Sequence, residues 1–216
     1  MKGKGSYNEI AGQSVERLAA LSDGVFAVAM TLLALDLRAP AMELIHSDQD
    51  LWNALAGMAS RLLLFVVSFM TLGIFWVGQQ TQLNHLKRSS RGLSWIHLGF
   101  LLAVCLTPFS TTLLAGFWHY RTAVFAYWLN ILALGLLLYV SWVCAEGTGL
   151  VRENAPGHLA NSIKRRIVVA QAWYAFAAAL VFIDARLSVG LFAAVQLNYA
   201  LAPRIPGMGA SGSEAK

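Results

Sequence analysis

The chain of 216 residues is 57% hydrophobic and only 12% charged, with a mean hydropathy of +0.58. A soluble domain carries about one-quarter charged residues, so this composition excludes an ordinary soluble enzyme or binding module. The net charge of +5 is spread between apolar segments. It does not form a basic stripe with interleaved aromatic residues, which argues against a nucleic-acid partner. The composition therefore predicts a protein that is solvated largely by lipid.

About twenty apolar residues in a helix cross a hydrocarbon layer of about 30 Å, and the sequence offers six candidate segments. They run from Leu18 to Leu37, Ala54 to Val77, Leu93 to Ala115, Ala123 to Ala145, Ile167 to Asp184 and Leu187 to Ala202. Only Ala185 and Arg186 separate the last two, so a tight hairpin and one long kinked segment both fit the sequence. We predict an all-α integral membrane protein, with a single six-helix transmembrane domain over residues 1–202. The tail over residues 203–216 is rich in Pro, Gly and Ser, which predicts disorder.

Basic residues are distributed unequally between the two predicted ends of the helices, and this bias predicts the orientation. One end has only Arg38, Arg61, Arg121 and Arg186. The other end collects Lys2, Lys4, Arg17, Lys87, Arg88, Arg91, Arg152, Lys164, Arg165, Arg166, Arg204 and Lys216. Because short cytoplasmic loops carry the excess of Lys and Arg, we predict a multi-pass protein of the cell membrane with both termini in the cytoplasm.

The first apolar segment is the most unusual one, because it contains Ser22 and Asp23. An intramembrane carboxylate costs a few kcal/mol, so both side chains are expected to be buried and to find partners. At 100° per residue, Asp23 points away from one shared face, formed by Gly24, Val28, Thr31, Leu32 and Leu35. That face is either an ordinary packing surface, with Thr31 bonded to its own backbone, or the wall of a narrow hydrophobic conduit. The periodicity leaves both interpretations open.

A motif in this segment resembles a known signature. The pattern Arg17-x-x-x-Leu21-Ser22-Asp23-Gly24 is similar to that of the transmembrane protein 175 family of potassium channels, which usually has Phe where Leu21 stands. Further similarities are Phe75-Trp76, Leu93-x-Trp95 and Pro108-Phe109-Ser110-Thr111, so the resemblance covers roughly the first 115 residues. The chain departs from the family at Gln79 and Gln80, where many members have a His pair, and at His97, where an Asn is common.

The resemblance implies a homotetramer in which four copies of the first helix surround one pore for monovalent cations, preferably potassium. In the family, the positions of Val28, Thr31 and Leu35 line this pore and form its constriction, and Leu32 lies on the same face. Asp36 follows at the outer end of the helix. It is either a carboxylate ring that concentrates cations at the outer mouth or a solvated helix terminus.

The remaining polar residues of the motif are interpreted as a structural and gating network. A charge pair or hydrogen bonds would join Arg17, Ser22 and Asp23 to Trp76 and to His97 on the third helix. A small secondary transporter, a proton-coupled permease or an intramembrane enzyme using Asp23 within one protomer is the alternative. A lipid-embedded scaffold without flux is a third possibility.

Neither a metal site nor an enzymatic site is predicted. Four histidines do not have the spacing that a metal or haem site requires; they are His85, His97, His119 and His158. Ser, His and Asp residues form no recognisable hydrolase constellation. We therefore expect no cofactor other than permeant K⁺, and no enzymatic activity.

Overall fold

The structure, a computed structural model, describes residues 14–153 and 158–201, and the named elements in these ranges are all helices. They are α2 (Val15–Leu35), the 3-10 helix η1 (Met42–Leu44), α3 (Asp48–Gly57), α4 (Ala59–Asn84), α5 (Arg91–Phe117), α6 (Arg121–Gly147), α7 (Leu159–Ala179), the 3-10 helix η2 (Leu180–Phe182) and α8 (Ala185–Leu201). The predicted all-α fold is confirmed. The predicted tail over 203–216 lies outside the described residues.

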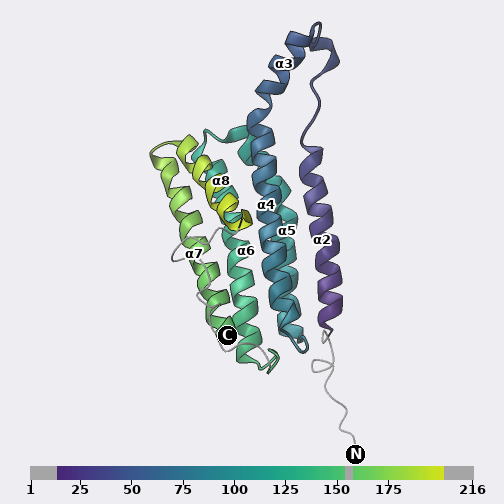
Figure 1. Ribbon diagram of the computed structural model, residues 1–216, viewed down its shortest axis with the longest axis vertical. Coiled ribbons are helices and arrows are strands. Elements are labelled where there is room, and N and C mark those ends of the chain that lie inside the picture. Colours follow the sequence, from purple (N-terminus) through teal and green to yellow (C-terminus); the bar gives the residue numbers. More distant parts are fainter. Residues whose placement is uncertain (1–13, 154–157, 202–216) are drawn as a thin grey trace, which may run out of the picture.

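The long helices form a bundle with α2 along one edge and α7 along the opposite edge (Figure 1). Among the described residues, five helices are long and apolar enough to cross a membrane: α2, α4, α5, α6 and the continuous stretch of α7 and η2. The sixth, α8, has 17 residues, which at the helical rise span about 25 Å. A short turn joins it to η2, and α8 folds back beside α7. The last two apolar segments are therefore a hairpin and not one kinked helix.

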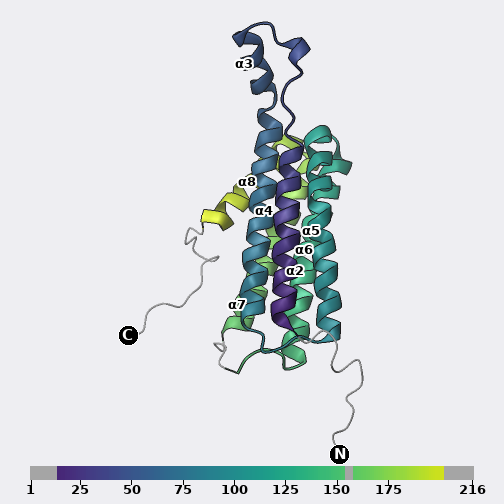
Figure 2. The ribbon, with the colours of Figure 1, turned by 90° about the vertical axis from the view of Figure 1, so that its right-hand side faces the viewer.

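Two predicted boundaries need correction. The second span begins at Ala59, because the helix is interrupted at Met58, and Ala54 belongs to α3. The segment that carries α3 projects beyond the rest of the bundle (Figure 2). The fifth span begins at Leu159 instead of Ile167, because the preceding Lys and Arg residues are helical although they are not apolar. Hydropathy locates the apolar part of a helix, so a boundary predicted from it leaves out helical turns that are charged.

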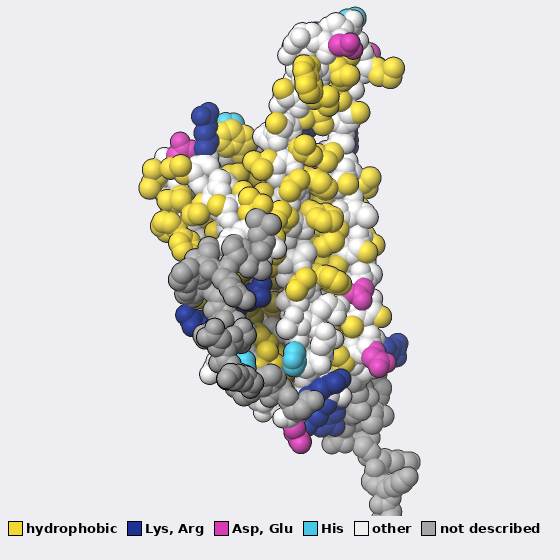
Figure 3. Space-filling view, in the orientation of Figure 1, with side chains coloured by type: hydrophobic (Ala, Val, Ile, Leu, Met, Phe, Trp, Pro, Cys, Tyr) yellow, Lys and Arg dark blue, Asp and Glu magenta, His cyan; other side chains and the backbone are white. Residues whose placement is uncertain are grey.

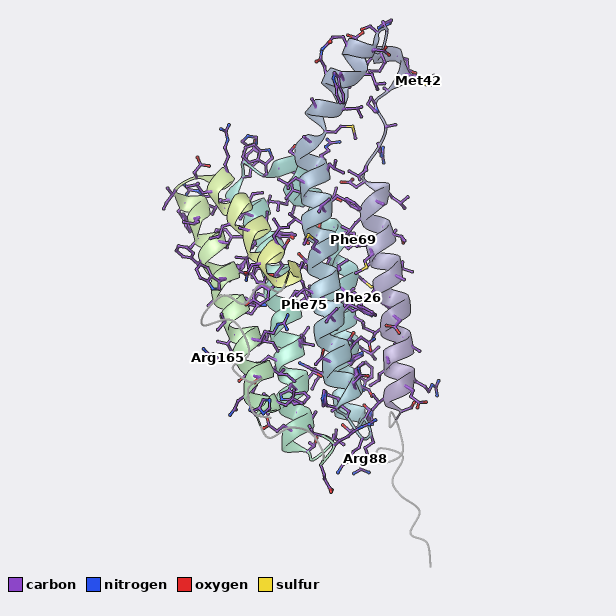
Figure 4. The ribbon with its side chains drawn as sticks, in the orientation of Figure 1. Phe26, Met42, Phe69, Phe75, Arg88 and Arg165 are labelled. Carbon is purple, nitrogen blue, oxygen red and sulfur yellow. The ribbon has the colours of Figure 1, made fainter. Side chains whose placement is uncertain are left out.

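Helix α2 packs against α4 and α5 through one face. Ser14 caps its N-terminus by accepting a hydrogen bond from the backbone N–H of Arg17. The buried side chains recur every three or four residues, as one helical face requires; they are Leu18, Ser22, Phe26, Ala29 and Leu33. Phe26 packs against Phe100 of α5 at 6.0 Å between ring centroids, and Phe100 packs against Phe75 of α4 at 6.4 Å. Figure 4 places Phe26 between α2 and α4.

Candidate functional site

The opposite face of α2 is apolar and exposed in the protomer. Val28 and Leu35 have 57% and 72% of their surface exposed, and Gly24, Thr31 and Leu32 are exposed as well. The structure therefore places on one open face the whole stripe that the sequence predicted. An apolar face of this length needs lipid or other protein against it, because water solvates it poorly. We call Gly24, Val28, Thr31, Leu32 and Leu35 the open stripe of α2.

Thr31 contributes the one hydroxyl of this open stripe. Its Oγ1 donates a hydrogen bond to the backbone carbonyl oxygen of Val28 at 2.8 Å. This is the bond to its own helix that the packing interpretation predicted. Because that bond uses the hydroxyl hydrogen, the lone pairs of Oγ1 remain on the exposed side as acceptors.

Asp36 is the C-cap of α2 and is half-buried. The C-terminal end of a helix carries a partial negative charge, so a carboxylate there destabilises the helix by a few tenths of a kcal/mol. Helix stability therefore does not explain this residue. Its position at the end of the open stripe fits both the carboxylate ring at the outer mouth and the solvated helix terminus.

A buried polar cluster joins α2 to α4 and α5. The Oγ of Ser22 donates to the carbonyl oxygen of Leu18 at 2.7 Å and accepts from Nε2 of Gln79 at 2.9 Å. The same oxygen lies 2.7 Å from Nε2 of His97, and Gln79 Nε2 also lies 2.7 Å from that ring nitrogen. Ser22, Gln79 and His97 are all buried. Two of the three departures from the family pattern, Gln79 and His97, thus meet each other in one cluster.

Asp23 lies at the exposed edge of the same contact between α2 and α4. Its Oδ1 accepts from Nε1 of Trp76 at 2.8 Å and from Nε2 of Gln80 at 2.7 Å. The predicted partner Trp76 is therefore correct. The expected burial is wrong for Asp23, which is exposed in the protomer although the adjacent Ser22 is fully buried. Adjacent residues are 100° apart on a helix, so the helix cannot bury both equally on one narrow face.

Arg17 does not join this network in the described part of the chain. It is exposed, and its backbone N–H bonds to Ser14, whereas the ion pair found among the described residues joins Lys164 to Glu146. Arg17 precedes Val28 by eleven residues, which is close to three helical turns, so its side chain lies on the same exposed face of α2 as the open stripe. The predicted charge pair between Arg17 and the network is therefore absent from the described part of the chain.

Sequence reasoning missed a second buried polar cluster, between α4, α5, α6 and α8. Tyr127 OH lies 3.2 Å from Ser68 Oγ and accepts from Nε2 of Gln196 at 3.4 Å, and Thr111 donates to Ser68 at 2.8 Å. Asn130 accepts from Thr107 and Ser110 at 3.0 and 3.2 Å. Polar side chains at helical spacing inside apolar spans are the signal that would have found this cluster.

Replacing Ser22 by alanine is expected to lower the free energy of unfolding by about 1 kcal/mol, because Gln79 and His97 then lose a buried partner. Chemical unfolding in detergent checks this. Ser162→Ala is the matched control, since Ser162 is exposed and donates to the carbonyl oxygen of His158 at the start of its own helix. Equal losses in the two variants would mean that the buried cluster adds nothing.

Comparison with known proteins supports the sequence resemblance. The model of the family described as endosomal/lysosomal potassium channel TMEM175 matches residues 17–108. A potassium channel of Streptomyces collinus is 31% identical over 192 residues, covering 85% of this chain and 90% of that protein. A potassium channel of Chamaesiphon minutus is 29% identical over 189 residues, covering 86% of this chain and 93% of the other.

A solved structure is similar over nearly the same extent. The crystal structure of a lysosomal potassium-selective channel TMEM175 homolog from Chamaesiphon minutus has a TM-score of 0.76 and 27% identity, and the match covers 87% of this chain and 97% of that one. The motif around Ser22 and Asp23, the helical membrane fold and these matches agree. The chain belongs to the TMEM175 family of potassium channels.

Proposed function

We propose that this protein is a potassium-preferring cation channel of the cell membrane in which four copies place the open stripe of α2 around one pore. The carrying observation is that this stripe is apolar and exposed, with a single hydroxyl, on the helix that holds the family motif. The family consists of channels and not enzymes, and the relatives matched are named potassium channels.

The open stripe suits a hydrophobic constriction. A ring of four branched side chains at Val28 and another at Leu35 would remove water from an ion without supplying ligands, which creates a desolvation barrier. The Oγ1 lone pairs of Thr31, between these rings, would replace part of the hydration shell. Potassium holds its water less strongly than sodium, so a partial replacement favours potassium. Asp36 would form a carboxylate ring at the outer mouth and raise the local cation concentration.

The polar contacts of α2 suit a structural and gating role in this channel. Ser22 and Asp23 bond to α4 and α5 on the side away from the open stripe. They would fix the rotation of α2 and so decide which side chains face the pore. Both termini would lie in the cytoplasm, in accordance with the charge bias.

A single-protomer transporter or permease that uses Asp23 is the alternative. That function needs the carboxylate to face a water-filled cavity within one protomer. The Asp23 oxygen instead accepts bonds from Trp76 and Gln80 at the protomer surface. This arrangement favours a contact role, and the channel is the better-supported function.

Recording from purified protein in planar bilayers tests the proposal. With potassium on one side and sodium on the other, discrete unitary currents should reverse at a potential that favours potassium. Flux without unitary currents, saturating and coupled to a proton gradient, would instead support the transporter.

Thr31→Val should weaken the preference for potassium with little gain in conductance. Valine keeps the volume of the side chain but removes the only side-chain oxygen of the open stripe, so the potassium ion loses a ligand while the pore keeps its width. Reversal potentials under potassium and sodium gradients measure the change. An unchanged permeability ratio would remove the proposed role of the hydroxyl and leave constriction size alone. Thr112→Val is the control, because Thr112 is exposed on α5 and donates to the carbonyl oxygen of Pro108 in its own helix.

A further inference from the structure

Helix α5 contains a proline in its interior, Pro108. Proline has no backbone N–H, so the carbonyl oxygen of Val104 loses its helical donor, and the proline ring crowds the same carbonyl. Space filling shows hydrophobic side chains over the middle of the bundle and Lys or Arg side chains towards the end that carries the α4–α5 connection (Figure 3). Pro108 is 17 residues after Arg91, about 25 Å along the axis from that end, so it lies at an apolar depth. Neighbouring side chains must therefore satisfy the backbone around it, because lipid supplies no partners.

Asn130 of α6 bonds to α5 on both sides of this proline. Its Nδ2 donates to the carbonyl oxygen of Ala103 at 2.9 Å. Its Oδ1 accepts from Thr107 at 3.0 Å and from Ser110 at 3.2 Å. Ala103 and Thr107 precede Pro108, whereas Ser110 follows it, and all of these Asn130 partners are buried. A single amide thus spans the interruption, and a bend at Pro108 that moves Ala103 away from Ser110 must break one of its contacts.

The hydroxyls around the proline each have two acceptors within reach. Thr107 and Ser110 lie near Asn130 and also near a carbonyl oxygen of α5, at 3.2 and 3.0 Å. Thr111 lies 2.8 Å from Ser68 of α4 and 2.8 Å from the carbonyl oxygen of Thr107. A hydroxyl has one hydrogen, which can move from the neighbouring helix to its own helix as α5 bends. Each donor then keeps a partner, which avoids the cost of an unpaired buried group.

Helix α2 is attached to the part of α5 that precedes Pro108. His97 lies 2.7 Å from Ser22, and Phe100 packs against Phe26 at 6.0 Å between ring centroids. In Figure 2, α2 lies between α4 and α5. A movement of this part of α5 about the proline therefore carries α2 with it.

We propose that Pro108 is a hinge in α5 and that Asn130 is the positioning residue that holds the hinge in the conformation described here. Bending at Pro108 moves the first part of α5 together with α2, and so changes how the open stripe of α2 faces the pore. This inference rests on the proposed channel function and deepens it, because it assigns residues outside the pore to gating.

Single-channel recording of a double-mutant cycle tests the hinge. Asn130→Leu nearly keeps the side-chain volume and removes the amide, so the bent conformation becomes more populated. The ratio of open to closed time should change about fivefold, the factor that corresponds to one buried hydrogen bond. The conductance and the reversal potential should stay those of the wild type. In Pro108→Ala, which restores the backbone N–H, adding Asn130→Leu should leave the ratio unchanged; an equal change in both backgrounds would reduce Asn130 to packing and overturn the hinge.

Gln82→Leu is the matched control. Gln82 is another buried amide between α4 and α6, and its Nε2 donates to the carbonyl oxygen of Leu138 at 3.1 Å. Helix α4 contains no proline. The control should keep the open-to-closed ratio of the wild type. A change as large as that of Asn130→Leu would mean that the loss of any buried amide alters gating, and would contradict a specific hinge.

A distance measurement tests the bend without relying on current. Spin labels at Leu98→Cys and Val168→Cys would report the position of the first part of α5 relative to α7, in a background with Cys105→Ala and Cys144→Ala. Leu98 and Val168 are both exposed, at 40% and 55%. Excess unlabelled protein restricts the signal to distances within one protomer. Leu98 is ten residues before the proline, so a bend of about 20° moves it by about 5 Å.

Asn130→Leu should broaden or shift this distance distribution by a few Å, and the same substitution combined with Pro108→Ala should not. An unchanged distribution in Asn130→Leu would overturn the hinge. A shifted distribution in a protein that gives no unitary potassium currents would contradict the channel proposal and leave the hinge in place. If Asn130→Leu does not fold, Ser110→Ala removes a donor on the other side of the proline and should shift the distribution in the same direction; no shift there would overturn the hinge.

Discussion

Replacing Leu35 by alanine is expected to raise the single-channel conductance and reduce the preference for potassium. Leu35 is the most exposed large side chain of the open stripe, at 72%. In a fourfold ring, leucine would narrow the path and strip water from the ion. Alanine widens the ring, so the ion keeps more of its shell. A barrier lowered by about 1 kcal/mol raises the conductance about fivefold.

Single-channel recording with potassium and sodium on opposite sides measures both quantities. Leu62→Ala is the control, because Leu62 is also exposed, at 51%, but lies on α4. Its conductance should equal that of the wild type. An unchanged conductance in Leu35→Ala would mean that this position does not limit conduction.

Asp23→Ala is expected to lower the yield of folded, assembled protein far more than it changes selectivity. Trp76 and Gln80 both donate to the same carboxylate oxygen, so alanine leaves two donors unpaired and costs about 2 kcal/mol. Asp23→Asn should be milder, because its Oδ1 still accepts both bonds. Since the carboxylate lies off the open stripe, the permeability ratio of the remaining channels should stay near that of the wild type.

Size-exclusion chromatography of the purified variants and reversal potentials of the reconstituted ones separate these effects. Asp48→Ala is the control, because Asp48 is an exposed carboxylate on α3, outside the predicted spans. A normal yield for Asp23→Ala combined with a large change in ion preference would assign the carboxylate to the ion path.

The open stripe of α2 was predictable because helical geometry alone determines which residues share a face. Val28, Thr31 and Leu35 are three and four residues apart, so they align whatever the rest of the fold does. Trp76 was predicted as a partner of Asp23 from the family motif and not from helical geometry. The contacts of Gln79 with Ser22 and His97 depend on how three helices pack, which no pattern within one helix contains.

Burial was harder to predict than position. Asp23 was expected to be buried because charge is costly in a membrane, yet the protomer leaves it exposed with two donors. The free-energy cost of a carboxylate in hydrocarbon applies to the assembled protein in its bilayer. It does not determine how exposed Asp23 is in a single protomer. Helix ends were also missed, as at Leu159 and Met58, because charged turns and a local break do not alter the average hydropathy of a segment.

Cysteine modification tests the central claim, that the open stripe of α2 lines the ion path. In a background with Cys105→Ala and Cys144→Ala, Leu35→Cys and, as control, Leu62→Cys would be exposed to a charged, water-soluble thiol reagent during single-channel recording. The account predicts that modification blocks the current of Leu35→Cys and leaves that of Leu62→Cys unchanged. An unaffected current in Leu35→Cys, with the modification verified by mass spectrometry, would contradict it.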